Sequence, residues 1–209
     1  MSAIKLNSSG GGSITISPAS TASTLTLTAP ANTGTIVSTG SSAVVTPTML
    51  SQPLTLMTVQ NSTSGTSIDF TGIPSWVKRI TVMFNGVSTN GTSNLQIQLG
   101  SSGGFETTGY GSSMTYIVNA TPATANISTG LLAGNYGSAG ASYNGITIIS
   151  TLGNNIWASS CNLCDGPSTR TFLGAGAKTL SGTLDRIRIT TVNGTDAFDA
   201  GSINIMYEG

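Results

Sequence analysis

The chain has 209 residues, with seven Lys and Arg, seven Asp and Glu, no histidine and no net charge. The absence of histidine excludes Ser-His-Asp and Cys-His nucleophiles and every His-ligated metal site. The small and balanced charge argues against a nucleic-acid binder that neutralises phosphates. We therefore expect a protein without enzymatic activity and without a cofactor, which fills space or makes contacts.

Serine, threonine and glycine dominate the composition, with 30 Ser, 33 Thr and 27 Gly. Disordered chains are usually rich in charge and poor in apolar residues, whereas this chain is 38% hydrophobic and 7% charged. Abundant Thr, Val and Ile, interrupted by Gly, Asn and Pro, are typical of short strands and tight turns. No apolar run approaches the ~20 residues that span a bilayer, and the first residues lack the pattern of a secretory signal. We expect an all-β protein that is made in the cytosol and not inserted into a membrane.

Residues 1–42 contain one charged residue, Lys5, and no aromatic residue. Three short alternating runs lie around Ile14, Leu25 and Ile36, each beside a Pro- or Gly-containing bend. So few aliphatic side chains cannot offset ~1–2 kcal/mol of backbone entropy per ordered residue. Identical chains packed about one axis would bury them, and we predict a homotrimeric stem. The residues predicted to form its trimer and docking core are Ile14, Ile16, Leu25, Leu27, Ile36 and Val37.

Residues 43–66 contain Pro47 and Pro53 within an aliphatic stretch. Prolines at this frequency exclude a long helix and favour extended chain or edge strands. We predict a connector between the stem and a head domain over residues 67–209, where every aromatic residue and all charges except Lys5 are found.

The head shows regular strand signals and no sustained helical period. The predicted strands cover residues 68–70, 80–84, 95–99, 114–118, 146–149, 156–158, 180–182, 186–190 and 203–207. The Asn85-Gly86 dipeptide predicts a tight turn, and residues 101–113 and 121–144 are expected to be long loops. The pattern predicts an antiparallel β-sandwich of jelly-roll type.

Cys161 and Cys164 form the one C-x-x-C motif of the chain. A zinc ribbon needs a second pair, and a thioredoxin-like site needs a βαβ unit that the sequence lacks. Two structural thiols or a local disulfide are therefore favoured over half of an inter-chain metal site or a redox site.

Several further patterns have a plain structural interpretation. Residues 172–179 lack the Gly before Lys178 that a phosphate loop requires, which predicts a loop leading into a strand. Asp196 and Asp199 lie in a turn, where capping of backbone amides is favoured over binding of Ca²⁺.

Glu106 and Asp185 are the two carboxylates that could be paired as in a glycosidase. Asp185 begins a strand beside Arg186 and Arg188, so an ion pair is favoured over catalysis.

The aromatic residues divide into core and surface candidates. Trp157 is predicted to be core, and Trp76 to cover the bottom of the sandwich against the connector. Tyr110, Tyr136 and Tyr143 lie in Gly-rich stretches and are the candidates for contact with a receptor, since exposed aromatic rings can stack on sugars.

Two stretches resemble proteins of tailed bacteriophages. The first, within residues 10–40, has the sequence GGGSITISPASTASTLTLTAPANTGTIVST and is similar to a short repeat near the N-termini of tail-fibre and head-fibre proteins. The second, residues 67–104, has the sequence SIDFTGIPSWVKRITVMFNGVSTNGTSNLQIQLGSSGG and resembles a β-rich module of phage and prophage virion proteins. A weaker likeness extends over residues 184–207. The resemblance implies a homotrimeric fibre or decoration protein whose N-terminal part is fixed to the particle, through other virion proteins of the tail or capsid.

The leading hypothesis is thus a non-enzymatic structural protein of the virion, a small fibre of tail or head with a displayed β-sandwich. Weak contacts of three heads, for example with a host surface glycan, would become effective through multivalency, which raises avidity by ~10²–10⁴. The alternative is a monomeric carbohydrate-binding module or lectin. A glycan hydrolase would require Glu106 or Asp185 to line a cleft with another acid.

Overall fold

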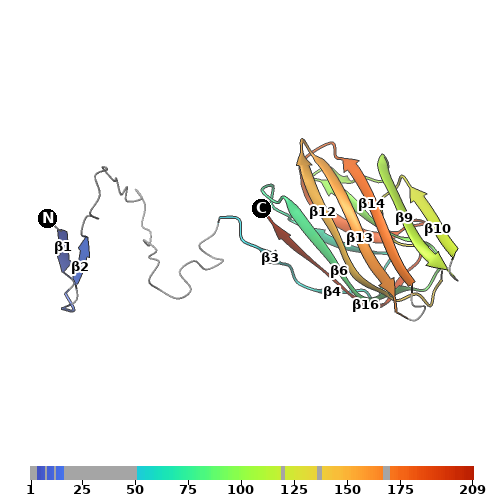
Figure 1. Cartoon of the computed structure of the whole chain (residues 1–209), viewed down its shortest axis with the longest axis horizontal. Helices are drawn as coiled ribbons and strands as arrows, with labels where there is room; N and C mark the ends of the chain where they lie inside the picture. The colour runs from blue at the N-terminus through green and yellow to red at the C-terminus, as the bar shows by residue number, and fades with distance from the viewer. Residues whose placement is uncertain are drawn as a thin grey trace. The chain divides into compact units, whose positions relative to one another are not determined.

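We analysed a computed structural model of the chain. The structure describes residues 4–7, 9–11, 13–16, 51–118, 121–135, 138–166 and 170–209. The chain divides into two units, residues 1–44 and 45–209, and each is described by itself. In the first unit, β1 (Ile4–Asn7) pairs antiparallel with β2 (Ser13–Ile16), which coincides with the first predicted run (Figure 1).

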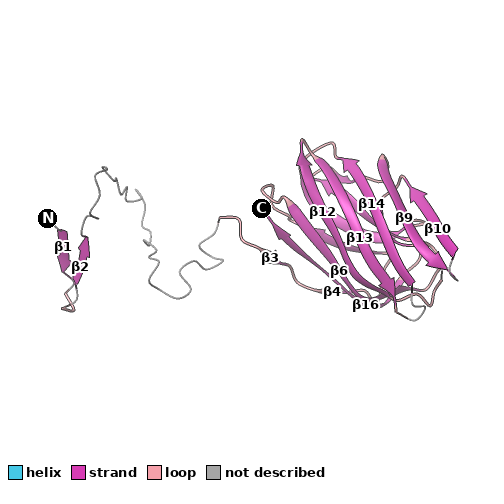
Figure 2. Ribbon diagram, in the orientation of Figure 1, coloured by secondary structure: helices cyan, strands magenta, loops and turns pink. Residues whose placement is uncertain are grey.

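The second unit is built from two antiparallel sheets, and the described residues contain no helix (Figure 2). The nine-stranded sheet consists of β3 (Thr55–Leu56), β4 (Gln60–Asn61), β6 (Arg79–Thr89), β9 (Tyr110–Val118), β10 (Thr121–Ile127), β12 (Tyr143–Gly153), β13 (Ile156–Asp165), β14 (Arg170–Thr179) and β16 (Phe198–Glu208). The five-stranded sheet consists of β5 (Ser67–Thr71), β7 (Leu95–Ser101), β8 (Gly104–Phe105), β11 (Leu131–Gly134) and β15 (Leu184–Thr191). The predicted all-β, antiparallel fold is confirmed.

The chain crosses repeatedly between the two sheets. The order in the larger sheet is β10-β9-β14-β13-β12-β6-β16-β3, with β4 also paired to β16, and in the smaller sheet β11-β7-β15-β5, with β8 paired to β7. Figure 1 shows β12, β13, β14, β9 and β10 side by side across the sandwich. No described segment forms a helix of the length and apolarity needed to span a bilayer.

One hydrophobic core lies between the sheets. Period-2 alternation along β6 turns Ile80, Val82 and Phe84 into this core, and the neighbouring strands alternate in the same way. Trp157 is buried on β13, as predicted. Trp76 is partly buried and packs edge-on against Tyr207, with ring centroids 5.8 Å apart.

Several strands are longer or more numerous than predicted. Residues 121–144, expected to be a loop, include β10 and β11, and the expected loop 101–113 includes β8 and the start of β9. Residues 172–179 lie entirely within β14. Residues 180–182 were predicted wrongly, because they form the bend between β14 and β15.

The Asn85-Gly86 turn is also a wrong prediction, because β6 continues through it. The register of β6 against β12 and β16 shifts at this point, which marks a β-bulge. Gly86 has a φ of 63° and donates its backbone N–H to Oδ1 of Asn144 at 2.8 Å. A bulge with a glycine in the left-handed region and a type I′ turn both use positive φ, so the dipeptide alone does not distinguish them.

The segment predicted to be a connector contributes to the sandwich. β3 and β4, at residues 55–61, pair with β16 along the edge of the larger sheet. The side-chain amide of Asn204 on β16 donates to the carbonyl of Met57 at 2.8 Å. The globular unit therefore extends upstream of residue 67.

Phe172 on β14 should be a main determinant of stability. It is fully buried, and its ring lies 5.7 Å from that of Tyr116 and 5.6 Å from that of Tyr143. We expect Phe172→Ala to lower the free energy of unfolding by about 3–5 kcal/mol. The neighbouring Leu173 is 58% exposed on the opposite face, so Leu173→Ala should change it by less than about 0.5 kcal/mol. Denaturant unfolding of the two variants measures the difference, and equal effects would contradict the described packing.

Candidate functional site

A groove of about 400 Å³ opens on the outer face of the five-stranded sheet. Strands β5, β7 and β15 supply its floor, and the loops after β8, β10 and β15 supply its walls. Gln96 and Gln98 of β7 lie in the floor because they alternate with the core residues Leu95, Ile97 and Leu99. The Gln-x-Gln alternation was visible in the sequence, but the surrounding loops that make it a groove were not.

The floor is held by hydrogen bonds from β7 to the end of β15 and to the loop after β10. The side-chain amide of Gln96 donates to the carbonyl of Thr191 at 3.1 Å and accepts from the hydroxyl of Thr129 at 2.8 Å. The amide of Gln98 donates to the carbonyl of Thr129 at 3.0 Å. Gln96 and Gln98 are only 2% and 6% exposed, so these bonds fix both side chains in position.

Arg188 of β15 is the one charged side chain among the described residues that line the groove. Its Nε and Nη2 donate to the two carboxylate oxygens of Asp69 at 2.8 and 2.7 Å, a bidentate pair across β15 and β5. Its guanidinium lies 4.2 Å from the ring centroid of Phe105. The hydrogen bonds that Arg188 donates to Asp69 raise the pKa of Arg188, and the neighbouring carboxylate group offsets its positive charge in the groove.

One end of the groove is formed by the turn between β15 and β16. The carboxylate of Asp196 accepts from the side chain of Asn193 at 2.6 Å and from the backbone N–H of Ser93 at 2.8 Å. These two bonds hold the pKa of Asp196 below its ordinary value. The predicted role of Asp196 as a cap of backbone amides is confirmed, whereas Asp199 is exposed on β16. No group of three or more acidic or cysteine side chains suited to a metal ion occurs among the described residues.

Glu106 precedes Thr107 of the groove wall, but its carboxylate interacts with Lys178 and Ser181. It forms an ion pair with Lys178 at 2.6 Å and accepts from the backbone N–H and the hydroxyl of Ser181 at 2.7 and 2.8 Å. Burial alone would raise the pKa of Glu106, but the hydrogen bonds from Lys178 and Ser181 outweigh it and hold the pKa below its ordinary value.

Asp185 forms the predicted ion pair with Arg186, with the Nε to Oδ1 distance at 2.7 Å. The hydrogen bond from Arg186 lowers the pKa of Asp185. Neither Asp185 nor Glu106 lines the groove, so the structure supplies no acid pair there for glycoside hydrolysis.

Two of the three tyrosines predicted to contact a receptor, Tyr110 and Tyr143, are buried in the core. Tyr110 is 4% exposed, and its hydroxyl donates to the carbonyl of Glu106 at 2.9 Å and accepts from the N–H of Leu99 at 2.7 Å. Burial raises the pKa of Tyr110 to about 12. Tyr143 is 5% exposed beside Phe172, and Tyr136 lies outside the described residues. The Gly-rich sequence suggested loops, but Tyr110 and Tyr143 begin strands that point them into the core.

Cys161 and Cys164 lie on opposite faces of β13 and are both free. Cys161 is buried, and its thiol lies 3.7 Å from the carbonyl of Ala133. Burial raises the pKa of Cys161 to about 11, whereas Cys164 is exposed. The local disulfide among the predicted alternatives is therefore absent, because residues three apart on a strand point in opposite directions.

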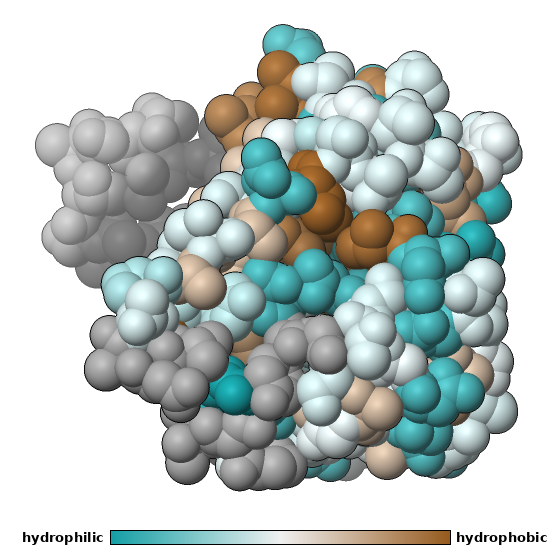
Figure 3. All heavy atoms as spheres, turned by 90° about the vertical axis from the view of Figure 1, so that its right-hand side faces the viewer, coloured by the Kyte–Doolittle hydropathy of each residue, from teal (hydrophilic) through white to brown (hydrophobic). Residues whose placement is uncertain are grey.

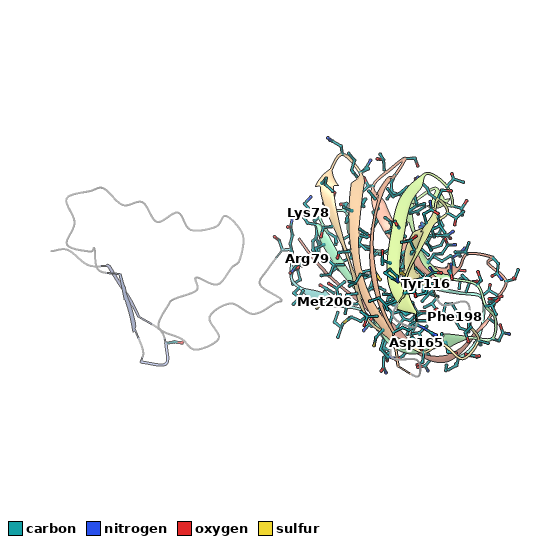
Figure 4. All side chains as sticks on the ribbon, turned by 45° about the vertical axis from the view of Figure 1, so that its right-hand side comes forward. Lys78, Arg79, Tyr116, Asp165, Phe198 and Met206 are labelled. Carbon is teal, nitrogen blue, oxygen red and sulfur yellow. The ribbon has the colours of Figure 1, made fainter. Side chains whose placement is uncertain are left out.

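The outer face of the nine-stranded sheet is a second exposed surface. From β10 to β12 its outward side chains carry no charge, and they include Ile117, Leu173 and Ile146, which are 60%, 58% and 41% exposed. Farther along the sheet, Arg79 pairs with Glu208 near Met206, at the β6–β16 end seen in Figure 4. The end of the sandwich shown in Figure 3 is mostly neutral to hydrophilic, with hydrophobic residues in separate small patches.

The predicted trimer core lies mainly outside the residues that the structure describes. Ile14 and Ile16 lie on β2, where the backbone alone is described, and Leu25, Leu27, Ile36 and Val37 fall outside the described ranges. The stem and its oligomeric state stay predictions.

Comparison with known proteins gave no relative. The chain matches no protein-family model, no curated protein and no solved structure. The function is therefore inferred from the residues and the geometry of the chain itself.

The Glu106–Lys178 pair should give a pH-dependent contribution to stability. The pKa of Glu106 in the folded chain is below its ordinary value of 4.5, so the ionised carboxylate stabilises the folded state above that pH. This stabilisation disappears as the pH falls through the folded pKa. We expect Glu106→Gln to lower the free energy of unfolding by about 1 kcal/mol at pH 7, and the difference from the wild type to vanish at low pH. Denaturant unfolding across this range measures it, with Asp199→Asn as an exposed control. A difference that grows on acidification would contradict the assignment.

The two cysteines should react differently with a thiol reagent. At pH 7–8 the folded chain is expected to take up one equivalent, at Cys164, because Cys161 is 3% exposed and its pKa is raised. Unfolding in denaturant should expose the second thiol. Mass spectrometry of the labelled chain gives the count and position, and Cys164→Ser should abolish labelling of the folded form. Rapid labelling of Cys161 would show that β13 is not packed as described.

Proposed function

We propose that the chain is a non-enzymatic structural protein of a bacteriophage particle, a small homotrimeric fibre or decoration protein. Its N-terminal unit would dock on other virion proteins and trimerise, and its β-sandwich would be displayed for adhesion to the host surface or for decoration. The resemblance of residues 10–40 and 67–104 to virion proteins motivates this proposal. The observation that carries it is the separation of the chain into a small N-terminal unit and a sandwich with its own complete core.

The chemistry of the acidic residues supports a binding rather than a catalytic role. Five of the seven Asp and Glu form ion pairs: Asp69, Glu106, Asp165, Asp185 and Glu208. Asp196 accepts from an amide side chain and a backbone N–H. A general acid or base must be within reach of a substrate and free to exchange a proton. Carboxylates held in this way stabilise loops and strand edges instead.

The surface of the sandwich also supports a role in assembly and adhesion. The outer face of β9, β14 and β12 combines exposed aliphatic side chains with a complete lack of charge. Exposed apolar side chains gathered on one uncharged face favour contacts with other proteins. In a trimer, three copies of any weak site on the head would act together.

A monomeric carbohydrate-binding module is the second candidate, and the polar groove on the five-stranded sheet favours it. A module of this type would bind through one groove and would not need the N-terminal unit. Oligomeric state separates the two candidates.

We expect the full chain to be a trimer and a fragment of residues 45–209 to be a folded monomer. The fragment keeps every residue of the hydrophobic core as well as β3 and β4, whose pairing with β16 completes the edge of the sheet. The aliphatic residues predicted to drive trimerisation lie in the part that is removed. Native mass spectrometry and circular dichroism of both chains make the measurement.

A fragment of residues 67–209 is the control for the edge strands. It lacks β3 and β4, so it should also be monomeric but melt at a lower temperature than the 45–209 fragment. A monomeric full chain would refute the fibre proposal, and a trimeric 45–209 fragment would move the interface to the sandwich.

A further inference from the structure

We propose that the groove on the five-stranded sheet is a binding site for a neutral carbohydrate. This inference rests on the proposed function in one respect: the avidity of three heads would make a weak single site effective. The site itself is defined by residues of one sandwich. No residue outside the 45–209 unit is needed to form it.

The groove has the size and construction of a small-ligand site. Its volume of about 400 Å³ falls within the ~300–1,000 Å³ typical of ligand pockets. The outer face of an antiparallel sheet normally faces water, yet Gln96, Gln98 and Thr190 are buried at its floor. Loop residues such as Thr107 and Asn193 rise around them and give the face its concave shape.

The chemistry of the lining matches a ligand with many hydroxyl groups. Nine of the twelve lining residues carry a hydroxyl or an amide: Thr66, Ser67, Gln96, Gln98, Thr107, Thr129, Thr190, Thr191 and Asn193. Hydroxyl and amide groups both donate and accept hydrogen bonds, as sugar hydroxyls do. A hydrophobic ligand would find one aliphatic side chain there, Val192.

The charge distribution favours a neutral ligand over an anionic one. Arg188 donates two hydrogen bonds to Asp69, so an incoming carboxylate or phosphate would compete with this pair and meet the charge of Asp69. A sugar hydroxyl can accept or donate at the edge of the pair without separating it.

The floor is also preorganised. Gln96 and Gln98 are held by bonds to Thr129 and Thr191, and Arg188 is held between Asp69 and Phe105. Binding then requires little ordering of side chains, which is a main cost of forming a complex. A groove with flexible polar side chains would lose this advantage.

The test measures the binding of free oligosaccharides to the full chain by saturation-transfer NMR. The neutral probes are oligosaccharides of glucose, galactose, mannose, rhamnose and N-acetylhexosamines, and the acidic probes carry sialic or uronic acid. We expect at least one neutral probe to bind. Binding of acidic probes alone, or of no probe at millimolar concentration, overturns the proposal.

Two pairs of variants locate the binding. Ser67→Tyr on β5 would place a ring in the groove, whereas Thr71→Tyr places one on the same strand and the same face outside it. Thr107→Tyr and Thr108→Tyr form a second pair within one exposed loop, of which Thr107 alone lines the groove. We expect Ser67→Tyr and Thr107→Tyr to weaken binding about tenfold or more, with little change in their two controls.

The outcomes distinguish this inference from the proposed function. Circular dichroism confirms that each variant is folded, and the second pair keeps the test decisive if one variant is not. Equal binding by the groove variants and the controls overturns the site. Native mass spectrometry of the same samples reports the oligomeric state separately. A monomer that binds carbohydrate would support the groove site and refute the trimeric fibre. A trimer that binds no carbohydrate would support the fibre and refute the groove site.

Discussion

The packing of one face of each sheet against the other is the constraint on which the rest of this structure depends. In a chain with 7% charged residues and abundant serine and threonine, charge contributes little to deciding which side chains are buried and which are exposed. Alternation along β6, β7 and β16, interrupted by bulges in β6 and β16, decides this instead, because successive side chains point to opposite faces of a strand. A shift of one residue would exchange the two sets, and the register is therefore strongly specified. The bulge at Gly86 is accommodated because both neighbouring strands shift with it.

The same alternation generates the candidate site. In β7, the alternation that buries Ile97 and Leu99 in the core also turns Gln96 and Gln98 to the outer face. Amide side chains on an ordinary sheet face would be hydrated, but here the surrounding loops help to bury them, and the end of β15 and the loop after β10 supply their hydrogen-bond partners. The groove thus depends on both the strand and the loops, because the strand places the amides and the loops enclose them. Binding residues are often positioned in this way, on loops held by a rigid scaffold.

A strand could be predicted from the sequence where its residues alternate clearly between apolar and polar. It could not be predicted where close packing requires small residues instead. Residues 95–99, 186–190 and 203–207 alternate clearly and were located as strands. β14 was missed because its sequence, FLGAGAKT, is poor in β-branched residues. Its glycines are explained by close contacts, since a Cβ on Gly176 would lie 2.9 Å from Leu131 of β11. The tyrosines were misplaced for a related reason, because Gly-rich surroundings suggested loops where the chain in fact forms strands.

The few charged residues of the chain also help to hold strands and loops together through ion pairs. Each of the five ion pairs among the described residues joins a strand to a partner strand, a loop or a neighbouring residue. Arg188–Asp69 and Arg79–Glu208 both join directly paired residues of a sheet. Cross-strand ion pairs contribute modestly to stability, about 0.2–1 kcal/mol each, but they also disfavour other registers. Ten of the fourteen charged residues take part in these pairs, which leaves few charges on a surface rich in hydroxyl and amide groups to attract ions or polyelectrolytes. A head of this kind would select its contacts through shape and hydrogen bonding, which is the physical basis for the neutral ligand inferred for the groove.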